Sequence, residues 1–225
     1  MSIKLTQTGV VMPDGKTQTT KMDSTTDKGK LVAVDNWTGS GGTWTKRANV
    51  SKIHVIVVGG GGGGCGHNES GGAGGYSEKL IDVSGLAVGA TVAVTIGGGG
   101  DGRGYHQGCG NGGTTSFGSY VSAVGGYGAN TDWSHTGGRG GHGSGGDVNL
   151  WGGGGRSHGD EGQDRGGESF FGGSQIAGHH GGHYYRHWSE NLNHNPPGTG
   201  GNGEWHGHSR GGYGSAGICI VYNYQ

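Results

Sequence analysis

Six consecutive glycines, Gly59 to Gly64, directly follow the strand-like run Ile53–Val58, and glycine then recurs as far as Tyr213. Glycine makes up 62 of the 225 residues, but there are only 3 prolines and no three-residue repeat, so the chain is not a collagen. Each interior glycine costs a helix about 1 kcal/mol relative to alanine. No window places apolar residues at helical spacing without several glycines. The sequence therefore predicts an all-β fold with no significant helix.

Short apolar runs of strand length lie on both sides of the most glycine-rich region and predict the strands of the core. They occupy residues 53–58, 78–83, 91–96, 114–117, 120–124 and 216–222. Gly118 and Ser119 form a turn pair, so 114–117 and 120–124 are expected to form a hairpin. We expect a small β-sandwich-like scaffold that carries long glycine-rich loops.

Region 126–212 contains only four Val, Ile or Leu residues, so apolar burial alone cannot order it. Two outcomes are open. The region is floppy, or its backbones pack against each other as extended segments resembling polyglycine or polyproline II. In the second case the segments lie side by side and bond through N–H···O and Cα–H···O contacts.

The chain divides into two parts by composition. Residues 1–36 are polar, rich in threonine and poor in glycine, and Pro13–Lys16 is typical of a turn. This part is predicted to be an arm that gains order from a partner. Residues 37–225 are predicted to form one glycine-rich β domain, with 126–212 as its tip, rich in aromatic residues and histidine.

Charge, hydropathy and cysteine content exclude several classes of protein. The formal net charge of -1 argues against nucleic-acid binding, which needs an excess of Lys and Arg. The apolar runs are far shorter than the ~20 residues that cross a bilayer, and residues 1–8 show no signal-peptide pattern. The cysteines Cys65, Cys109 and Cys219 are odd in number and widely spaced, which favours free thiols in a reducing compartment. Cys219 lies on an apolar run and is expected in the core.

Two stretches together resemble the tail-fibre proteins of tailed bacteriophages. The run Pro13–Thr20 is similar to the DGTTQTT signature near the start of many fibre segments, with Lys16 in place of the usual threonine. The second stretch resembles the glycine-rich C-terminal domain of such fibres. Its landmarks, in order, are Trp44–Thr45, Val55–Gly59, Gly71–Tyr76, Val92–Gly100, Gly112–Gly118, Ser144–Leu150 and Gly217–Tyr222. Segment 156–212 departs from the plain glycine repeats by its His, Trp and Tyr residues and is interpreted as the variable part.

The resemblance implies a virion tail fibre, usually a homotrimer, assembled in the host cytoplasm. The arm would attach to other tail or baseplate proteins. The tip would bind a host-cell receptor (a glycan, lipopolysaccharide or outer-membrane protein) without covalent chemistry, and several copies would combine weak contacts into avidity. This interpretation predicts an adhesin and not an enzyme. The alternatives are a purely structural fibre or baseplate component and a glycan-degrading fibre enzyme.

Aromatic residues in the region poorest in aliphatic residues are the candidate receptor contacts. Flat rings with polar edges are typical of recognition surfaces, although they can also pack the glycine-rich layers together. The candidates are Tyr184, Tyr185, Arg186, Trp188, Trp205, Trp151, Trp133 and Phe170.

Histidine supplies the candidate metal ligands. In His206–His208 both side chains of an extended strand would point to one face. Three chains around an axis would then offer six imidazoles to an iron ion, as some phage fibre tips do; the alternative is solvated histidines. A second group, with zinc as its candidate metal, comprises His179, His180, His183 and His187. No other cofactor is expected.

Two further patterns have weaker chemical interpretations. The glycine run fits a dinucleotide fingerprint, and Asp82 stands at the expected distance. That site needs a helix to begin on the glycines, and 65–77 contains almost no helix former. The acids Asp160, Glu161 and Asp164 resemble a hydrolytic carboxylate set, but a glycine-rich region is a poor support for rigid placement.

Overall fold

The structure, a computed structural model, describes residues 29–66, 69–104, 107–130, 136–156, 165–173, 195–203 and 210–225. It also describes the backbone of three short strands, β1 (Lys4–Thr6), β2 (Gly9–Val11) and β3 (Thr17–Gln18), which form an antiparallel sheet of their own. The described residues contain no helix, which confirms the predicted all-β class.

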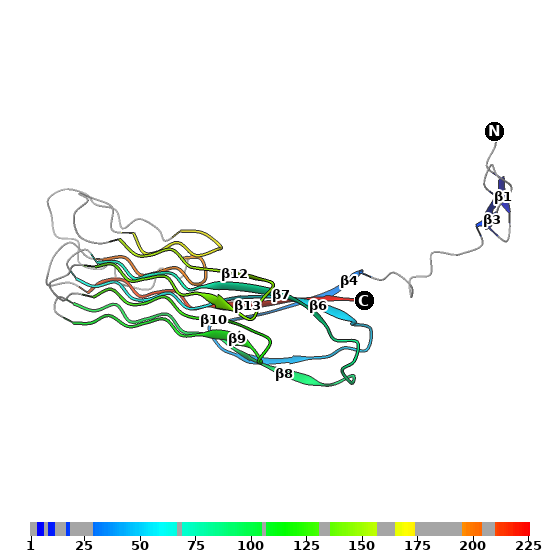
Figure 1. The fold of residues 1–225 in the computed structure, drawn as a ribbon, viewed down its shortest axis with the longest axis horizontal. Helices are drawn as coiled ribbons and strands as arrows, with labels where there is room; N and C mark the ends of the chain where they lie inside the picture. Colours follow the sequence, from blue (N-terminus) through cyan, green and yellow to red (C-terminus); the bar gives the residue numbers. More distant parts are fainter. Residues whose placement is uncertain are drawn as a thin grey trace.

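Two five-stranded antiparallel sheets form the scaffold (Figure 1). The first has the order β11-β10-β9-β8-β5. Its strands are β5 (Gly42–Thr45), β8 (Thr91–Thr95), β9 (Thr115–Phe117), β10 (Val121–Ala123) and β11 (Gly143–Ser144). The second has the order β12-β7-β6-β13-β4. Its strands are β4 (Leu31–Thr38), β6 (Lys52–Val58), β7 (Tyr76–Asp82), β12 (Val148–Leu150) and β13 (Ile218–Tyr224).

The apolar core lies between the two sheets. Because side chains alternate between the faces of a strand, every second residue of β6 and β13 points inward. Val55 of β6 and Val221 of β13 are fully buried, and so is Phe117 of the other sheet. Trp44 meets Phe117 edge to face, with ring centroids 5.9 Å apart. The predicted β-sandwich-like scaffold is thus confirmed.

Most predicted strands are present with small shifts of their ends. The hairpin across Gly118 forms as β9 and β10, and Gly118 has a φ of 51°, in the region that favours glycine. Residues 31–36, assigned to the arm by composition, belong instead to β4, which pairs with β13 along its length. The division into an attaching arm and a domain stays a prediction.

The glycine-rich segments run from the strands toward one end of the molecule as side-by-side extended chains (Figure 1). We call this part the glycine bundle. Its segments are 59–64, 70–75, 97–103, 110–113, 124–129, 137–141, 152–156, 165–168, 198–203 and 210–217. They bond to each other through backbone N–H and C=O groups. These hydrogen bonds lie outside the paired strands of the two sheets.

Segment 59–64 is the centre of the glycine bundle. Its N–H groups donate to three neighbouring segments in turn, with a period of three residues. Gly59 and Gly62 donate to segment 70–75, Gly60 and Gly63 to 110–113, and Gly61 and Gly64 to 210–217. The six N···O distances lie between 2.8 and 3.0 Å. Its carbonyls accept from segments 124–129, 97–103 and 198–203. Six chains therefore surround one chain that has the threefold repeat of polyproline II.

Glycine is needed in this centre because there is no room for a side chain. All six residues of Gly59–Gly64 are buried. A Cβ added to Gly62 would stand 2.1 Å from the carbonyl oxygen of Tyr127, and one added to Gly60 would stand 2.1 Å from that of Gly98. The predicted packing of extended backbones is confirmed, and the absent side chain is what permits it.

Candidate functional site

The end of the glycine bundle that lies away from the strands is the candidate functional end (Figure 1). At this end, backbone hydrogen bonds join the residues on either side of four gaps in the description. The joined pairs are Cys65–Glu69, Gly104–Gln107, Asn130–Thr136 and Arg156–Arg165. Gly203, before a fifth gap, donates to the hydroxyl of Ser70 at the same end. The bundle thus brings the described residues that flank these five gaps to one end.

A disulfide fixes this end of the bundle. Cys65, at the end of the central segment, is bonded to Cys109, and their Cα atoms lie 5.9 Å apart. The prediction that these two cysteines are free thiols is therefore wrong. The cysteines no longer favour a reducing compartment. The sequence did not reveal the pair because the bundle brings together residues 44 positions apart. Cys219 is free and fully buried, as predicted for a core residue, and burial raises its pKa to about 12.

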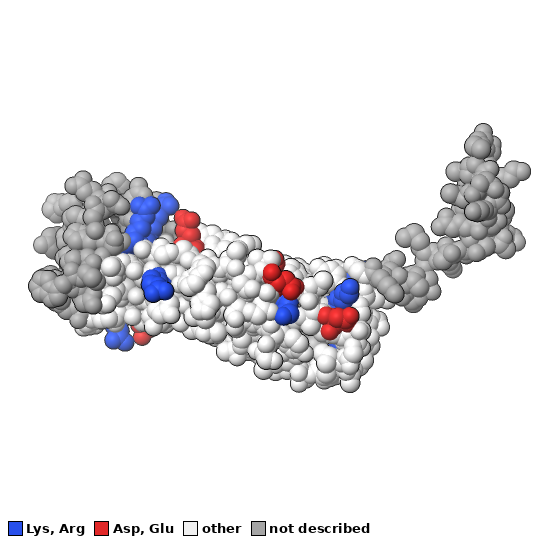
Figure 2. Space-filling view, viewed as in Figure 1, with Lys and Arg blue, Asp and Glu red and all other residues white. Residues whose placement is uncertain are grey.

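Arginine gathers at the candidate end. Five of the arginines in the described part of the chain lie there: Arg103, Arg139, Arg156, Arg165 and Arg210. Two of them stand over aromatic rings, Arg139 at 5.8 Å from the Tyr127 centroid and Arg210 at 6.0 Å from the Tyr213 centroid. On the face shown in Figure 2, basic side chains lie at this end of the described part, with acidic side chains beside them.

A recess of about 290 Å³ opens between two of these arginines. It is lined by Gly153, Gly154, Arg156, Arg165, Gly166 and Glu168. Arg165 lies 4.0 Å from Glu168. This arrangement presents planar cations beside exposed backbone, which suits hydrogen-bonding to polar or anionic groups. The sequence analysis did not select these arginines as site residues, although one signal was available: every Lys or Arg residue after Lys79 is an arginine.

Two predicted contact residues lie in the described part, and both lie on the flank of the molecule. Trp151 follows β12, has 65% of its surface exposed, and its ring centroid is 5.1 Å from that of His142. Phe170 is 55% exposed and stacks on Tyr76 at 3.9 Å. Each is partly displayed and partly used in packing. Neither lines the recess, although each lies two residues along the chain from a residue that does, Gly153 for Trp151 and Glu168 for Phe170.

The remaining predicted site residues lie outside the described residues. They are Trp133, Tyr184, Tyr185, Arg186, Trp188 and Trp205 for receptor contact, and His206 and His208 for a metal. The same holds for His179, His180, His183 and His187, and for Asp160, Glu161 and Asp164. Within the described ranges no group of three or more His, Cys, Asp or Glu side chains is placed to hold a metal ion.

The glycine run does not form a dinucleotide site. Gly59–Gly64 is enclosed by other backbone segments, and no helix begins on it. Asp82 is at the end of β7 and hydrogen-bonds to Ser84. The described part of the chain contains no helix long and apolar enough to cross a membrane.

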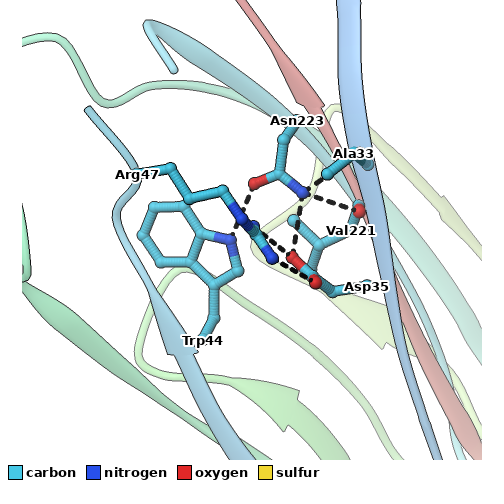
Figure 3. A network of polar contacts seen from close by, with 6 residues as sticks. All are labelled: Ala33, Asp35, Trp44, Arg47, Val221 and Asn223. Atoms are coloured by element: carbon cyan, nitrogen blue, oxygen red, sulfur yellow. Dashed lines mark hydrogen bonds and ion pairs between the residues drawn. The ribbon is translucent and has the colours of Figure 1, made fainter. Parts of the chain in front are cut away.

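A polar network anchors the opposite, strand end of the molecule (Figure 3). The Asn223 side chain accepts a 2.9 Å hydrogen bond from the Trp44 indole and donates to Asp35 at 3.0 Å. Arg47 donates two hydrogen bonds to the Asp35 carboxylate, at 2.7 and 2.6 Å. These bonds hold the pKa of Asp35 below its usual value and raise that of Arg47. The network ties β4 and β13 to β5 and is a structural anchor.

Comparison with known proteins identifies one family. The family described as Glycine-rich domain matches residues 35–224, which is most of the chain. No curated protein matches the sequence.

Proposed function

We propose, from the premise that the chain belongs to the glycine-rich domain family, that it is a tail-fibre adhesin of a bacteriophage, which binds a receptor on the bacterial surface without covalent chemistry. One observation carries the proposal. A hydrogen-bonded bundle without a side-chain core brings the described residues that flank five gaps together at the end farthest from the strand scaffold. Recognition residues are commonly carried on loops that a rigid scaffold positions.

The chemistry of that end supports recognition of a polar surface. The basic side chains at this end are arginines, and two of them stand over tyrosine rings. Arg and aromatic residues dominate binding energy at interfaces because they combine apolar area with directed hydrogen bonds. Bacterial glycans, lipopolysaccharide and outer-membrane protein loops all offer hydroxyl or anionic groups to such side chains.

The wider assignment follows from the sequence resemblance. In the proposal the protein is part of the virion, the arm attaches it to other tail or baseplate proteins, and three copies act together. The aromatic candidates in 174–194 and 204–209 would make the contacts. In a trimer, His206 and His208 of the three copies would together hold an iron ion.

The test is binding of fluorescently labelled protein to intact bacterial cells from a panel of strains, measured by flow cytometry. We expect saturable binding to at least one strain. Tyr185→Ala and Trp188→Ala should each reduce that binding at least tenfold without changing the thermal unfolding midpoint. Val88→Ala, an exposed residue of the strand scaffold, is the matched control and should bind like the wild type.

Two results would contradict the proposal. One is the absence of saturable binding to every strain. The other is binding that survives both substitutions and replacement of residues 204–209 by a Gly-Ser linker of equal length. Release of reducing ends from the bound polysaccharide would instead identify the glycan-degrading alternative.

A further inference from the structure

Two neighbouring segments of the glycine bundle hold the recess between them. Segments 152–156 and 165–168 run antiparallel to each other (Figure 1). The N–H of Gly153 donates to the carbonyl of Glu168 at 2.9 Å, and the N–H of Arg156 donates to the carbonyl of Arg165 at 3.4 Å. This pairing places the two arginines opposite each other, and both line the recess of about 290 Å³. Backbone hydrogen bonds therefore bring two cations to one hollow.

Hydrogen-bond donors of the recess have no acceptor within the described part of the protein. The Nε atom of Arg165 is buried there without a hydrogen-bond partner. Its Nη1 atom lies 4.0 Å from a carboxylate oxygen of Glu168, which is beyond hydrogen-bond distance. The exposed residue Gly154 also lines the recess, and its N–H donates to no described residue. Buried donors are normally paired, so this recess calls for an acceptor from outside the described residues.

The recess carries a net positive charge. Its charged lining residues are two arginines and one glutamate, so their formal charges sum to +1. The side chain of Glu168 is 67% exposed, and water therefore screens its carboxylate. An anion that enters the recess would meet two planar guanidinium groups, which bind carboxylates and phosphates through paired hydrogen bonds.

Exposed aromatic rings lie at the strand-side ends of the same two segments. Trp151 directly precedes one segment and is 65% exposed, and Phe170 lies two residues after the other and is 55% exposed. Both are neighbours of Tyr76. Phe170 stacks on its ring at 3.9 Å, and Leu150, which precedes Trp151, pairs with Tyr76 in the sheet. We call residues 151–156 and 165–170 the flank strip.

The flank strip combines two kinds of recognition group over a short distance. Trp151 and Arg156 are five residues apart, or about 15 Å at the rise of about 3.1 Å per residue of polyproline II. The C–H groups of a sugar ring are weakly positive and fit the negative face of an aromatic ring. A chain of acidic sugars would therefore meet the rings with its faces and the arginines with its anionic groups.

Other polyanions match the flank strip less well. Nucleic acid needs many cations along its phosphates, whereas the strip has two arginines and the whole chain has a net charge of -1. An acidic peptide such as polyglutamate would use the arginines and leave the exposed rings without a partner.

We infer that the flank strip binds an acidic saccharide. Arg156 and Arg165 bind its carboxylate or phosphate groups, and Trp151 and Phe170 pack against its sugar rings. The inference rests on the proposed function, because it names the class of receptor that the adhesin recognises.

The test is isothermal titration calorimetry of the full-length protein with four polymers. Polygalacturonate has sugar rings with carboxylates, and phosphomannan has sugar rings with phosphates. Fully methyl-esterified polygalacturonate has the same rings without charge, and poly-L-glutamate has carboxylates without sugar rings. We expect saturable binding of at least one acidic saccharide, at least tenfold tighter than binding of the methyl ester or of poly-L-glutamate.

Substitutions in the flank strip separate the two kinds of contact. Arg156→Gln and Arg165→Gln should each weaken saccharide binding at least threefold, and together at least tenfold. Trp151→Ala should weaken it at least threefold without changing any residual binding of poly-L-glutamate. Glu168→Gln removes a competing carboxylate and should strengthen binding at least twofold, a gain that damage to the fold cannot produce. The unfolding midpoint should stay unchanged in each variant.

The matched controls lie on the strand scaffold. Lys52→Gln removes an exposed cation, and Val88→Ala shortens a residue that is 65% exposed, like Trp151. Both should bind like the wild type. Failure of both acidic saccharides to bind would overturn the inference. Equal binding of the methyl ester or of poly-L-glutamate would overturn it too, as would wild-type binding by the double variant Arg156→Gln/Arg165→Gln.

Cell binding distinguishes failure of this inference from failure of the proposed function. Undiminished binding of the double arginine variant to bacterial cells would contradict the flank strip as a receptor site and leave the adhesin proposal intact. Binding of an acidic saccharide without binding to any strain would support the site and contradict the adhesin proposal.

Discussion

A single methyl group decides whether a glycine of this chain can be replaced. At Gly62, which is buried, an added Cβ would meet the backbone carbonyl oxygen of Tyr127 at 2.1 Å, and backbone cannot turn aside as a flexible side chain can. Gly98 lies in a neighbouring segment of the same bundle, is exposed, and would place its Cβ in open space. The same substitution should therefore have opposite consequences at the two positions.

We predict that Gly62→Ala lowers the free energy of unfolding by about 3 kcal/mol or more, or prevents folding. Gly98→Ala should leave it within about 1 kcal/mol of the wild type, because alanine also restricts the unfolded chain. Chemical denaturation followed by circular dichroism measures both values. Equal stability of the two variants would mean that the segments are not packed backbone against backbone.

The Asp35 carboxylate should make stability depend on acid pH. Hydrogen bonds from Arg47 lower its pKa in the folded protein. A carboxyl group with a lowered pKa contributes stability that is fully present above its unfolded pKa of about 3.9 and is lost as pH falls through the folded pKa. The denaturation midpoint should therefore fall more steeply below about pH 4 in the wild type than in Asp35→Asn. Parallel pH profiles of the two proteins would exclude this contribution.

At the scale of elements, the disulfide joins the central segment of the bundle to the segment that begins near Gln107. It closes a loop over a sequence separation of 44 residues, for which loss of the cross-link costs about 2–4 kcal/mol. We predict that reduction lowers the unfolding midpoint without unfolding the protein at 25 °C. Cys109→Ser should show the same lowered midpoint and no further response to reductant.

Thiol titration checks the same pairing independently. The native protein should show no reactive thiol, because Cys219 is buried and its raised pKa keeps it protonated. Denaturation without reductant should expose one thiol, and denaturation with reductant should expose all three. Three reactive thiols before reduction would show that Cys65 and Cys109 are not joined.

The elements that the sequence predicted are those with their own apolar pattern. β6, β8, β13 and the β9–β10 hairpin follow runs of Val, Ile and Phe at strand length. β4 was assigned to the arm because it continues a polar, threonine-rich stretch, and only its pairing with β13 identifies it as part of the sheet. β11 and β12 have two and three residues, too few for any periodicity to appear.

The arrangement of the bundle could not be predicted, for a different physical reason. Every glycine is chemically the same, so the sequence contains no information on which segment receives a given N–H. The neighbours of Gly60 and Gly61 are fixed only by the tertiary positions of segments 110–113 and 210–217. Trp151 and Phe170 were candidates for receptor contact or for packing, and their positions beside His142 and on Tyr76 were not foreseen.

At the scale of the whole molecule, two kinds of order support each other. The sandwich supplies a conventional apolar core, whereas the bundle has almost no side chains to bury. Ordering a backbone residue costs about 1–2 kcal/mol, and one hydrogen bond returns about 1 kcal/mol. Hydrogen bonds alone therefore do not hold the bundle. The strands at one end and the disulfide at the other limit the conformational freedom that the bundle has to lose.

The central claim is that the glycine-rich segments are ordered architecture and not flexible linkers, and hydrogen–deuterium exchange of peptides covering 59–64 tests it most directly. Each of these N–H groups donates to a backbone carbonyl inside the bundle. We predict that their exchange is as slow as that of the β6 and β13 amides and that it speeds up on reduction of the disulfide. Exchange of 59–64 within seconds, at the rate of an unfolded chain, while β6 and β13 stay protected, would contradict the account.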